Sequence, residues 1–166
     1  ARKKARDEAE EDVQLAEARF KKASARVDEV AALIGKPLLQ GLKDDDAFVR
    51  WISARIVGIL ARDPEVMVPA LAENFTDRDL DSRKAAIRAI GQYGPTASTA
   101  VPALARLLGR GDAEVRLSVL KALEGIGQQS VAALPAAVGE LAHPDPRVRI
   151  AAATLVGRFE ERARPY

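Results

Sequence analysis

The sequence predicts an all-α fold in which about four helical hairpins stack into an α-solenoid preceded by one long helix. Three observations predict it: a repeat of 33 residues, apolar side chains at helical spacing within each repeat, and abundant alanine, which strands disfavour. One hairpin cannot bury its apolar face alone, so successive repeats must pack on one another. The recurring residues are Asp46, Asp79, Asp112 and Asp145; Arg50, Arg83, Arg116 and Arg149; and Pro69, Pro102 and Pro135.

Residues 1–35 predict one long, charged amphipathic helix. Apolar residues recur every seven positions at Val13, Phe20, Val27 and Ile34, which is the spacing of a coiled-coil seam. Three interpretations remain open. The seam pairs with a second copy and gives a homo-oligomer through residues 1–35, it folds back as a cap on the first repeat, or the helix connects to an upstream domain. Gly35-Lys36-Pro37 predicts a turn at the end of this helix, followed by a short helix near 37–42.

Residues 36–166 form the predicted repeat domain, with units at about 36–62, 63–95, 96–128 and 129–162. In the third unit, Ser98 and Thr99 can cap a first helix that holds Pro102 in its opening turn, where a missing N–H costs little. Asp112 begins the second helix, where a carboxylate accepts free N–H groups and suits the helix dipole. Gly127 ends the unit.

These units resemble HEAT repeats, in particular the short bacterial HEAT-like repeats also found in phycobilin lyases. The resemblance covers roughly residues 36–162 and implies a right-handed α-solenoid with a binding role. It is carried by Val101-Pro102-Ala103-Leu104, by Asp112-Ala113-Glu114-Val115-Arg116 and by Asp145-Pro146-Arg147-Val148-Arg149. The second unit departs from the pattern, because Ser82 stands where the other units have valine. We expect this serine to weaken one core contact.

Composition and motifs argue against several classes of function. The chain has 26 basic and 24 acidic residues, so bulk charge does not indicate a polyanion partner. With no cysteine and one histidine, it offers neither a thiol nucleophile nor a cysteine or polyhistidine metal site. His143 and the cluster Asp44-Asp45-Asp46 are most simply turn and capping residues. We therefore expect no enzymatic activity, no cofactor, no metal site, no membrane span and, without an export signal, a cytoplasmic location.

The recurring aspartates and arginines predict a structural ladder. Each aspartate of the set Asp46, Asp79, Asp112 and Asp145 would cap the second helix of its unit. The arginine four residues later would reach an aspartate of its own unit or of the next one. Contact of these side chains with a ligand is the alternative interpretation.

A partner-binding stripe is predicted on the second helices, opposite the positions equivalent to Val49, Ser53, Ile56 and Leu60, which we expect to face the core. In HEAT-like arrays the second helices line the concave side. The predicted stripe consists of Trp51, Arg55, Lys84, Arg88, Leu117, Lys121 and Ile150, and Gly58 and Gly91 continue it by one turn. Trp51 is the only tryptophan. It would either anchor a partner or pack against the N-terminal helix.

We expect a non-enzymatic scaffold or adaptor that binds a protein or peptide on the concave face. Nucleic-acid binding is one alternative: the ladder Arg55, Arg88 and Lys121 favours it, whereas the net charge of only +2 counts against it. A bilin lyase or isomerase activity is a second alternative, by similarity to the lyase group. The absence of histidine and tyrosine from the stripe argues against that activity.

Overall fold

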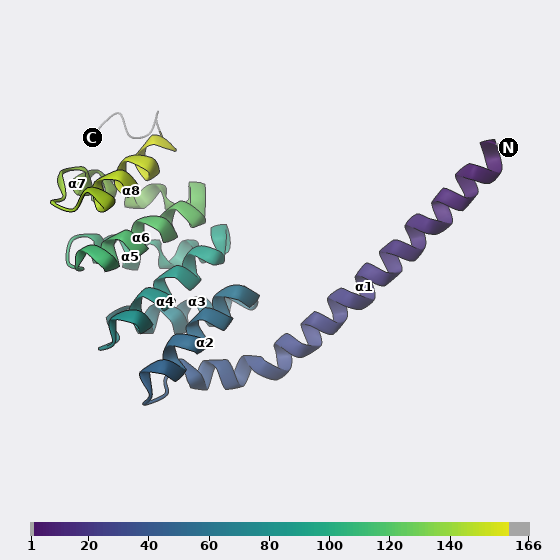
Figure 1. Ribbon diagram of the computed structural model, residues 1–166, viewed down its shortest axis with the longest axis horizontal. Coiled ribbons are helices and arrows are strands. Elements are labelled where there is room, and N and C mark those ends of the chain that lie inside the picture. Colours follow the sequence, from purple (N-terminus) through teal and green to yellow (C-terminus); the bar gives the residue numbers. More distant parts are fainter. Residues whose placement is uncertain (1, 160–166) are drawn as a thin grey trace. The chain divides into compact units, whose positions relative to one another are not determined.

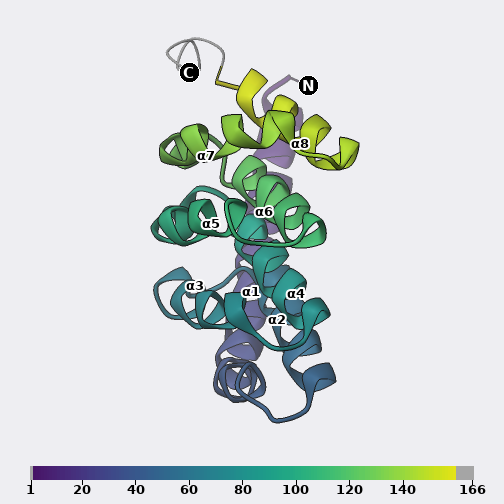
Figure 2. The same cartoon turned by 90° about the vertical axis from the view of Figure 1, so that its left-hand side faces the viewer.

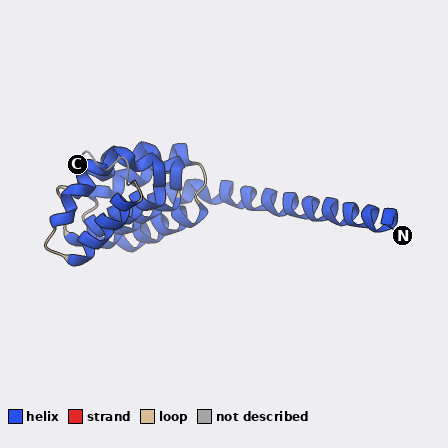
Figure 3. Ribbon diagram, turned by 90° about the horizontal axis from the view of Figure 1, so that it is seen from above, coloured by secondary structure: helices blue, strands red, loops and turns tan. Residues whose placement is uncertain are grey.

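The computed structural model describes residues 2–159, with the side chains of residues 13–26, 29–30 and 33–159. Every regular element in this range is helical (Figure 3). The chain divides into two compact units, residues 1–37 and residues 38–166, and each is considered by itself. No described helix combines the length and apolar character needed to cross a membrane.

Helix α1 runs without interruption over Arg2–Gly41. The sequence-based prediction of a turn at Gly35-Lys36-Pro37, with a separate short helix after it, is therefore wrong. A proline inside a helix removes one backbone hydrogen bond and costs about 3 kcal/mol. Burial of Leu38 and Leu42, on the turn that follows Pro37, offsets that cost. In the first unit, Val13, Phe20 and Val30 are exposed, and Val27 lies outside the described side chains.

The compact unit of residues 38–166 is a stack of helices in two layers. Figure 2 shows one layer made of α3, α5 and α7 and the other made of α2, α4, α6 and α8, in chain order along the stack (Figure 1). The first layer comprises α3 (Pro64–Glu73), α5 (Val101–Leu108) and α7 (Leu134–Gly139). The second comprises α2 (Ala47–Leu60), α4 (Leu80–Gln92), α6 (Ala113–Ile126) and α8 (Pro146–Gly157). Single-turn 3₁₀ segments η1 (Asn74–Thr76) and η4 (Glu140–Ala142) follow α3 and α7.

The core lies between the two layers. Leu71 of α3, Ile87 of α4, Leu104 of α5 and Leu123 of α6 are fully buried. Each such side chain contributes about 1.5–3 kcal/mol when it leaves water. Because they come from successive hairpins, the core is continuous along the stack and no hairpin holds it alone.

Two glycines let the second-layer helices approach closely. A Cβ at Gly58 would lie 2.8 Å from the Cα of Ala89, and a Cβ at Gly91 would lie 2.8 Å from the Cα of Ala122. Only glycine leaves room at this distance. Both residues therefore belong to the contacts between α2, α4 and α6, and their predicted place on the partner-binding stripe is wrong.

The first-layer helices of the third and fourth units do not begin with a capping side chain. The 3₁₀ segments η2 (Gly94–Ala100) and η3 (Gly127–Ala133) lead directly into α5 and α7. Because η2 runs directly into α5, the Val101 N–H donates to the backbone carbonyl of Ser98, and no side chain caps the start of α5. The prediction that Ser98 and Thr99 cap this helix is wrong. Gly127 adopts φ of 70°, a conformation that favours glycine, where α6 ends.

Ser82 makes a polar contact between units rather than a weakened apolar one. Its side chain is 1% exposed, and its hydroxyl donates a hydrogen bond of 3.0 Å to the carbonyl of Ala47 at the start of α2. The expectation that this serine only weakens the core is thus incorrect. The hydroxyl satisfies a carbonyl of the preceding hairpin while being buried itself.

Candidate protein-binding surface

The turns between the layers are held by the recurring aspartates. The carboxylates of Asp46, Asp79, Asp112 and Asp145 accept the backbone N–H of Phe48, Ser82, Val115 and Arg147, respectively, at 2.7–2.9 Å. These bonds satisfy donors that a helix start leaves free. Hydrogen bonds from Ser82 lower the pKa of Asp79 below its ordinary value. The start of each second-layer helix is therefore fixed at the same repeat position.

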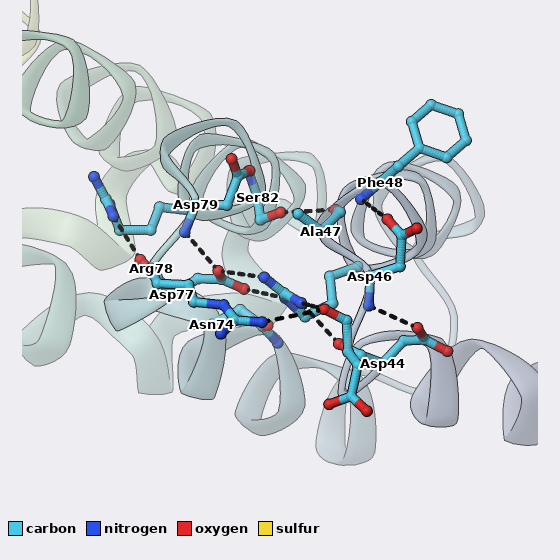
Figure 4. Close-up of polar contacts among 12 residues, drawn as sticks. Asp44, Asp46, Ala47, Phe48, Asn74, Asp77, Arg78, Asp79 and Ser82 are labelled. Atoms are coloured by element: carbon cyan, nitrogen blue, oxygen red, sulfur yellow. Dashed lines mark hydrogen bonds and ion pairs between the residues drawn. The ribbon is translucent and has the colours of Figure 1, made fainter.

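Arg50 connects the first two hairpins through its contact with Asp77, which Figure 4 labels. Its Nε and Nη2 donate to the two carboxylate oxygens of Asp77 at 2.6 and 2.9 Å, and its Nη1 donates to the carbonyls of Asp44 and Asp45. The two side chains are only 8% and 5% exposed. The hydrogen bond from Arg50 lowers the pKa of Asp77, and the same bond raises the pKa of Arg50. This buried pair ties the turn of one hairpin to the turn of the next.

The other recurring arginines repeat the arrangement. Each donates to a backbone carbonyl in its own turn: Arg83 to Asp77, Arg116 to Gly111, and Arg149 to His143 and Pro144. Two of them also reach an acid of the following hairpin. Arg83 lies 3.9 Å from Asp112, and Arg116 lies 2.8 Å from the buried Glu140. The arginines therefore reach along the stack to acids at differing positions, and two of those acids, Asp77 and Glu140, are outside the recurring aspartate set.

His143 has a structural part in the same turns. Its Nδ1 accepts the N–H of Asp145 at 3.0 Å, as the side chains of Asp44 and Asp77 accept the N–H of Asp46 and Asp79. Residues 44, 77 and 143 occupy equivalent repeat positions, so the imidazole substitutes for a carboxylate. Among the described side chains, no group of three metal-ligating residues comes together.

An aromatic and cationic cluster lies on the outer face of α2. We call it the Trp51 patch and define it by Phe48, Trp51, Arg55 and Ile59. The rings of Phe48 and Trp51 are 5.4 Å apart, and the Arg55 guanidinium carbon lies 4.6 Å from the Trp51 ring centroid. Both contacts are favourable in themselves. Yet Phe48 is 66% exposed and Ile59 is 69% exposed. Large apolar side chains are thus held in place on a surface that the hairpin stack does not cover.

Two hollows flank the Trp51 patch where α2 meets α4. One has a volume of about 510 Å³ and is lined by Ala47, Phe48, Trp51, Asp79, Asp81 and Arg88. The second has about 380 Å³ and is lined by Trp51, Arg55, Ile59, Ala85, Arg88, Ala89 and Gln92. Trp51 and Arg88 border both. The patch thus combines an aromatic wall with adjacent depressions, which suits a side chain of a partner.

Three cations follow one another along the second layer. We call Arg55, Arg88 and Lys121 the cationic stripe. All three are exposed, and within the described part of the chain none of them forms an ion pair. Neighbouring cations differ, because Lys84 pairs with Asp81 at 3.0 Å and Arg147 pairs with Glu114 at 2.9 Å. The stripe therefore carries positive charge that these residues do not neutralise.

The structure places the sequence-predicted stripe residues at different depths. Arg55, Arg88, Lys121 and Ile150 are exposed, whereas Trp51, Lys84 and Leu117 are half-buried. The buried face of α2 consists of Arg50, Ser53, Ala54, Val57 and Gly58. It is rotated by about one residue from the predicted core positions Val49, Ser53 and Ile56. Phe48 and Ile59 were missed for this reason. A helical face through Arg55, continued four residues forward to Ile59 and seven residues back to Phe48, would have found both.

Residues 35–124 match the HEAT repeats. No curated protein matches the chain. Among solved structures, the crystal structure of an engineered protein is similar, with a TM-score of 0.60 and 22% sequence identity over 74% of this chain. The match spans 60% of that engineered protein, and at this identity it supports the fold alone.

Proposed function

Since the chain belongs to the HEAT-repeat family, we propose that it is a non-enzymatic scaffold whose Trp51 patch and cationic stripe bind a protein partner. HEAT repeats generally serve as protein-interaction scaffolds and are generally non-enzymatic. The observation that carries the proposal is the Trp51 patch, where Phe48 and Ile59 are exposed beside a tryptophan stacked by arginine. Tryptophan and arginine are enriched among residues that dominate binding energy.

The rigidity of the stack supports this function. The turns are tied by Arg50 and its equivalents, and Gly58 and Gly91 permit close contact between successive second-layer helices. A surface built on such helices is ordered before the partner arrives. Binding then loses less conformational entropy than binding to a flexible loop would. In this proposal the second layer forms the concave, partner-facing side.

A capture experiment with matched variants tests the proposal. The test variant replaces Trp51, Arg55 and Arg88 by alanine. The control variant replaces Val66, Arg106 and Arg110 by alanine: an exposed apolar residue of α3, an exposed arginine of α5 and an exposed arginine of the turn after α5. We expect the unaltered chain and the control variant to capture the same protein from nuclease-treated extract and the test variant to lose it. Circular dichroism melting confirms that all three chains fold.

Two results would reject the proposed surface. One is equal capture of the protein by all three chains. The other is capture that disappears on nuclease treatment and falls steeply with salt, since phosphate contacts release counterions and produce that dependence. The second result would assign the cationic stripe to nucleic acid instead.

The proposal gives α1 the part of an attachment element. Its exposed apolar residues Val13 and Phe20 lie seven residues apart, as the predicted seam requires, and a helix cannot bury its own seam. Sedimentation of the full chain and of a Phe20→Asp variant separates the two main interpretations. A dimer that the substitution dissociates supports pairing with a second copy. A monomer in both cases would reject that pairing.

A further inference from the structure

We infer that copies of this chain stack end to end, with α8 of one copy packed against α2 of the next. The two helices lie at opposite ends of the second layer (Figure 1). This inference goes beyond the proposed function and does not depend on it. It rests on an open side of α8, a partly open apolar side of α2, and charges of opposite sign beside them.

Two sets of residues mark the sides of a second-layer helix that meet its neighbours. We call one set the α8 edge: Arg149, Ala153 and Gly157. We call the other set the α2 edge: Ile52, Ile56 and Leu60. The repeat positions of the two sets differ by two residues, or about 200° around a helix, so the edges face opposite sides of the layer.

Within the chain, the corresponding positions already meet. Gly58 of α2 occupies the repeat position of Gly157. Ala89 of α4 occupies the repeat position of Ile56. A Cβ at Gly58 would lie 2.8 Å from the Cα of Ala89, so these two positions touch where α2 packs on α4, and the same contact recurs between α4 and α6. A second copy in the same register would therefore bring its Ile56 against Gly157.

The α8 edge is open at positions that the preceding hairpins close. Ala153 is exposed, whereas the residues at its repeat position in the three preceding units are at most 1% exposed: Ala54, Ile87 and Leu120. A Cβ at Gly157 would meet nothing within 4 Å. In the preceding units, the hairpin that follows covers these positions. Because Ala153 and Gly157 are small, the open edge leaves room for another helix to approach.

The α2 edge is apolar and only partly covered. Ile52, Ile56 and Leu60 are half-buried, whereas their equivalents on α4 are buried: Ala85, Ala89 and Tyr93. The side of α2 that corresponds to the α2-facing side of α4 thus carries large apolar side chains with no helix of the second layer against them. Their burial against a neighbour is favourable by about 25 cal/mol per Å² of apolar surface. The bulk of Ile56 suits Gly157, which adds no side chain of its own.

The charges at the two ends select a second copy as that neighbour. Arg149 is the repeat equivalent of Arg50, yet it donates only to carbonyls of its own turn and forms no ion pair with a described residue. Asp44 stands 33 residues before Asp77, the acid that pairs with Arg50, and it is exposed. Both carboxylates accept the N–H two residues ahead. A second copy in register therefore presents Asp44 to Arg149 as Asp77 is presented to Arg50.

This contact joins two different edges, so it is heterologous. Each copy keeps one free edge after it binds, and the assembly grows by addition instead of closing as a dimer. A charge-swap experiment in the full chain tests the inference. Every chain carries Phe20→Asp, which removes pairing through the seam of α1, and the mass is measured by sedimentation equilibrium over a wide range of concentration.

We expect the mass of the Phe20→Asp chain to rise with concentration beyond that of a dimer. Arg149→Glu and Asp44→Arg should each weaken association at least about thirty-fold, because each places like charges in a buried contact. Arg106→Glu on α5, a charge reversal of equal size at an exposed position of the first layer, should change association by less than about two-fold.

A mixture of the two charge variants is the decisive arm. The Arg149→Glu chain keeps Asp44 and the Asp44→Arg chain keeps Arg149, so every contact between unlike chains pairs one acid with one base. We expect the mixture to associate like the Phe20→Asp chain, although neither variant does so alone. Gly157→Val blocks the approach without a change of charge. Gly139→Val, at a position that is equally open at the end of α7, is its control and should associate normally.

A chain that stays monomeric or stops at a dimer, equal association of Arg149→Glu and Arg106→Glu, or a mixture that fails to associate would each overturn the inference. Circular dichroism melting shows whether each variant folds. If the charge variants do not fold, equal association of Gly157→Val and Gly139→Val overturns it as well. The altered residues lie outside the Trp51 patch, so these results leave the proposed function to its own capture experiment.

Discussion

The Arg50–Asp77 pair gives the sharpest prediction about stability. Replacing Asp77 by alanine leaves the Arg50 charge 8% exposed with no acceptor for Nε and Nη2. Removal of one partner from a buried pair costs about 3–5 kcal/mol, since the other charge stays buried and unpaired. For a domain whose free energy of unfolding is about 5–15 kcal/mol, this is a large fraction. We therefore expect Asp77→Ala to be among the most damaging substitutions at a turn.

Glu73→Ala is a matched control across the same two hairpins. Glu73 pairs with Lys43 at 2.9 Å, but both side chains are more than 60% exposed, so the loss should be at most about 1 kcal/mol. Urea unfolding at pH 7 measures both variants, with Trp51 emission reporting on α2 and circular dichroism on the whole stack. If Asp77→Ala loses no more free energy than Glu73→Ala, the pair is not the clamp that its burial indicates.

Three further predictions concern the Asp77 carboxylate, the close approach at Gly91 and the buried Tyr93 hydroxyl. Because the folded pKa of Asp77 is lowered, the stability that its ionised form supplies is complete above the unfolded pKa of about 4 and disappears as pH falls through the folded pKa. The difference in urea midpoint between the unaltered chain and Asp77→Asn should therefore shrink only at acid pH, and a constant difference down to pH 2 would contradict this. Gly91→Val should cost at least about 1–3 kcal/mol through collision with Ala122, whereas Gly139→Ala, with nothing within 4 Å, should melt close to the unaltered chain; equal melting temperatures of the two variants would refute the close approach. Burial raises the pKa of Tyr93 to about 12, and its hydroxyl donates a hydrogen bond to the Arg62 carbonyl at 2.7 Å. In a Tyr166→Phe variant, where Tyr93 is the one tyrosine left, the ultraviolet absorbance of phenolate should rise near pH 12, and a rise near pH 10 would show an accessible hydroxyl.

Periodicity predicts the fold well, because each hairpin must bury the same face. The recurring aspartates mark the starts of α2, α4, α6 and α8, and their spacing locates those helices to within a residue or two. Local sequence motifs predicted the ends of helices less well than the repeat did. The Gly35-Lys36-Pro37 motif predicts a helix end, yet burial of Leu38 and Leu42 keeps the helix going through it.

The candidate surface was harder to locate, since it depends on the rotation of each helix. Arg55, Arg88 and Lys121 were found because they occupy one repeat register and are charged. Phe48 and Ile59 are apolar residues outside the predicted stripe, and apolar side chains in an amphipathic helix usually face the core. In the structure both of them face outward, while Gly58 of the same helix is buried against Ala89. Packing between hairpins thus decided which apolar residues became surface.

The acids that pair with the recurring arginines were also only partly predictable from the sequence. The sequence predicts that each recurring arginine reaches an aspartate of its own unit or the next, and Arg83 does approach Asp112. Arg50 likewise pairs with Asp77, an aspartate of the next unit that lies outside the recurring set, whereas Arg116 pairs with Glu140 instead of an aspartate. These acids lie near the ends of the first-layer helices, at positions that differ between units. The partner of each arginine is therefore set by where its first-layer helix ends.

Site-specific photocrosslinking tests the central claim most directly. A photoreactive phenylalanine analogue replaces Phe48 on α2 or, in a second chain, Val66 on α3; the two residues are similarly exposed but belong to opposite layers. The account predicts that illumination in extract joins the chain to one protein partner from position 48 and not from position 66. Adducts of the same protein from both positions, or from position 66 alone, would contradict the assignment of binding to the Trp51 patch.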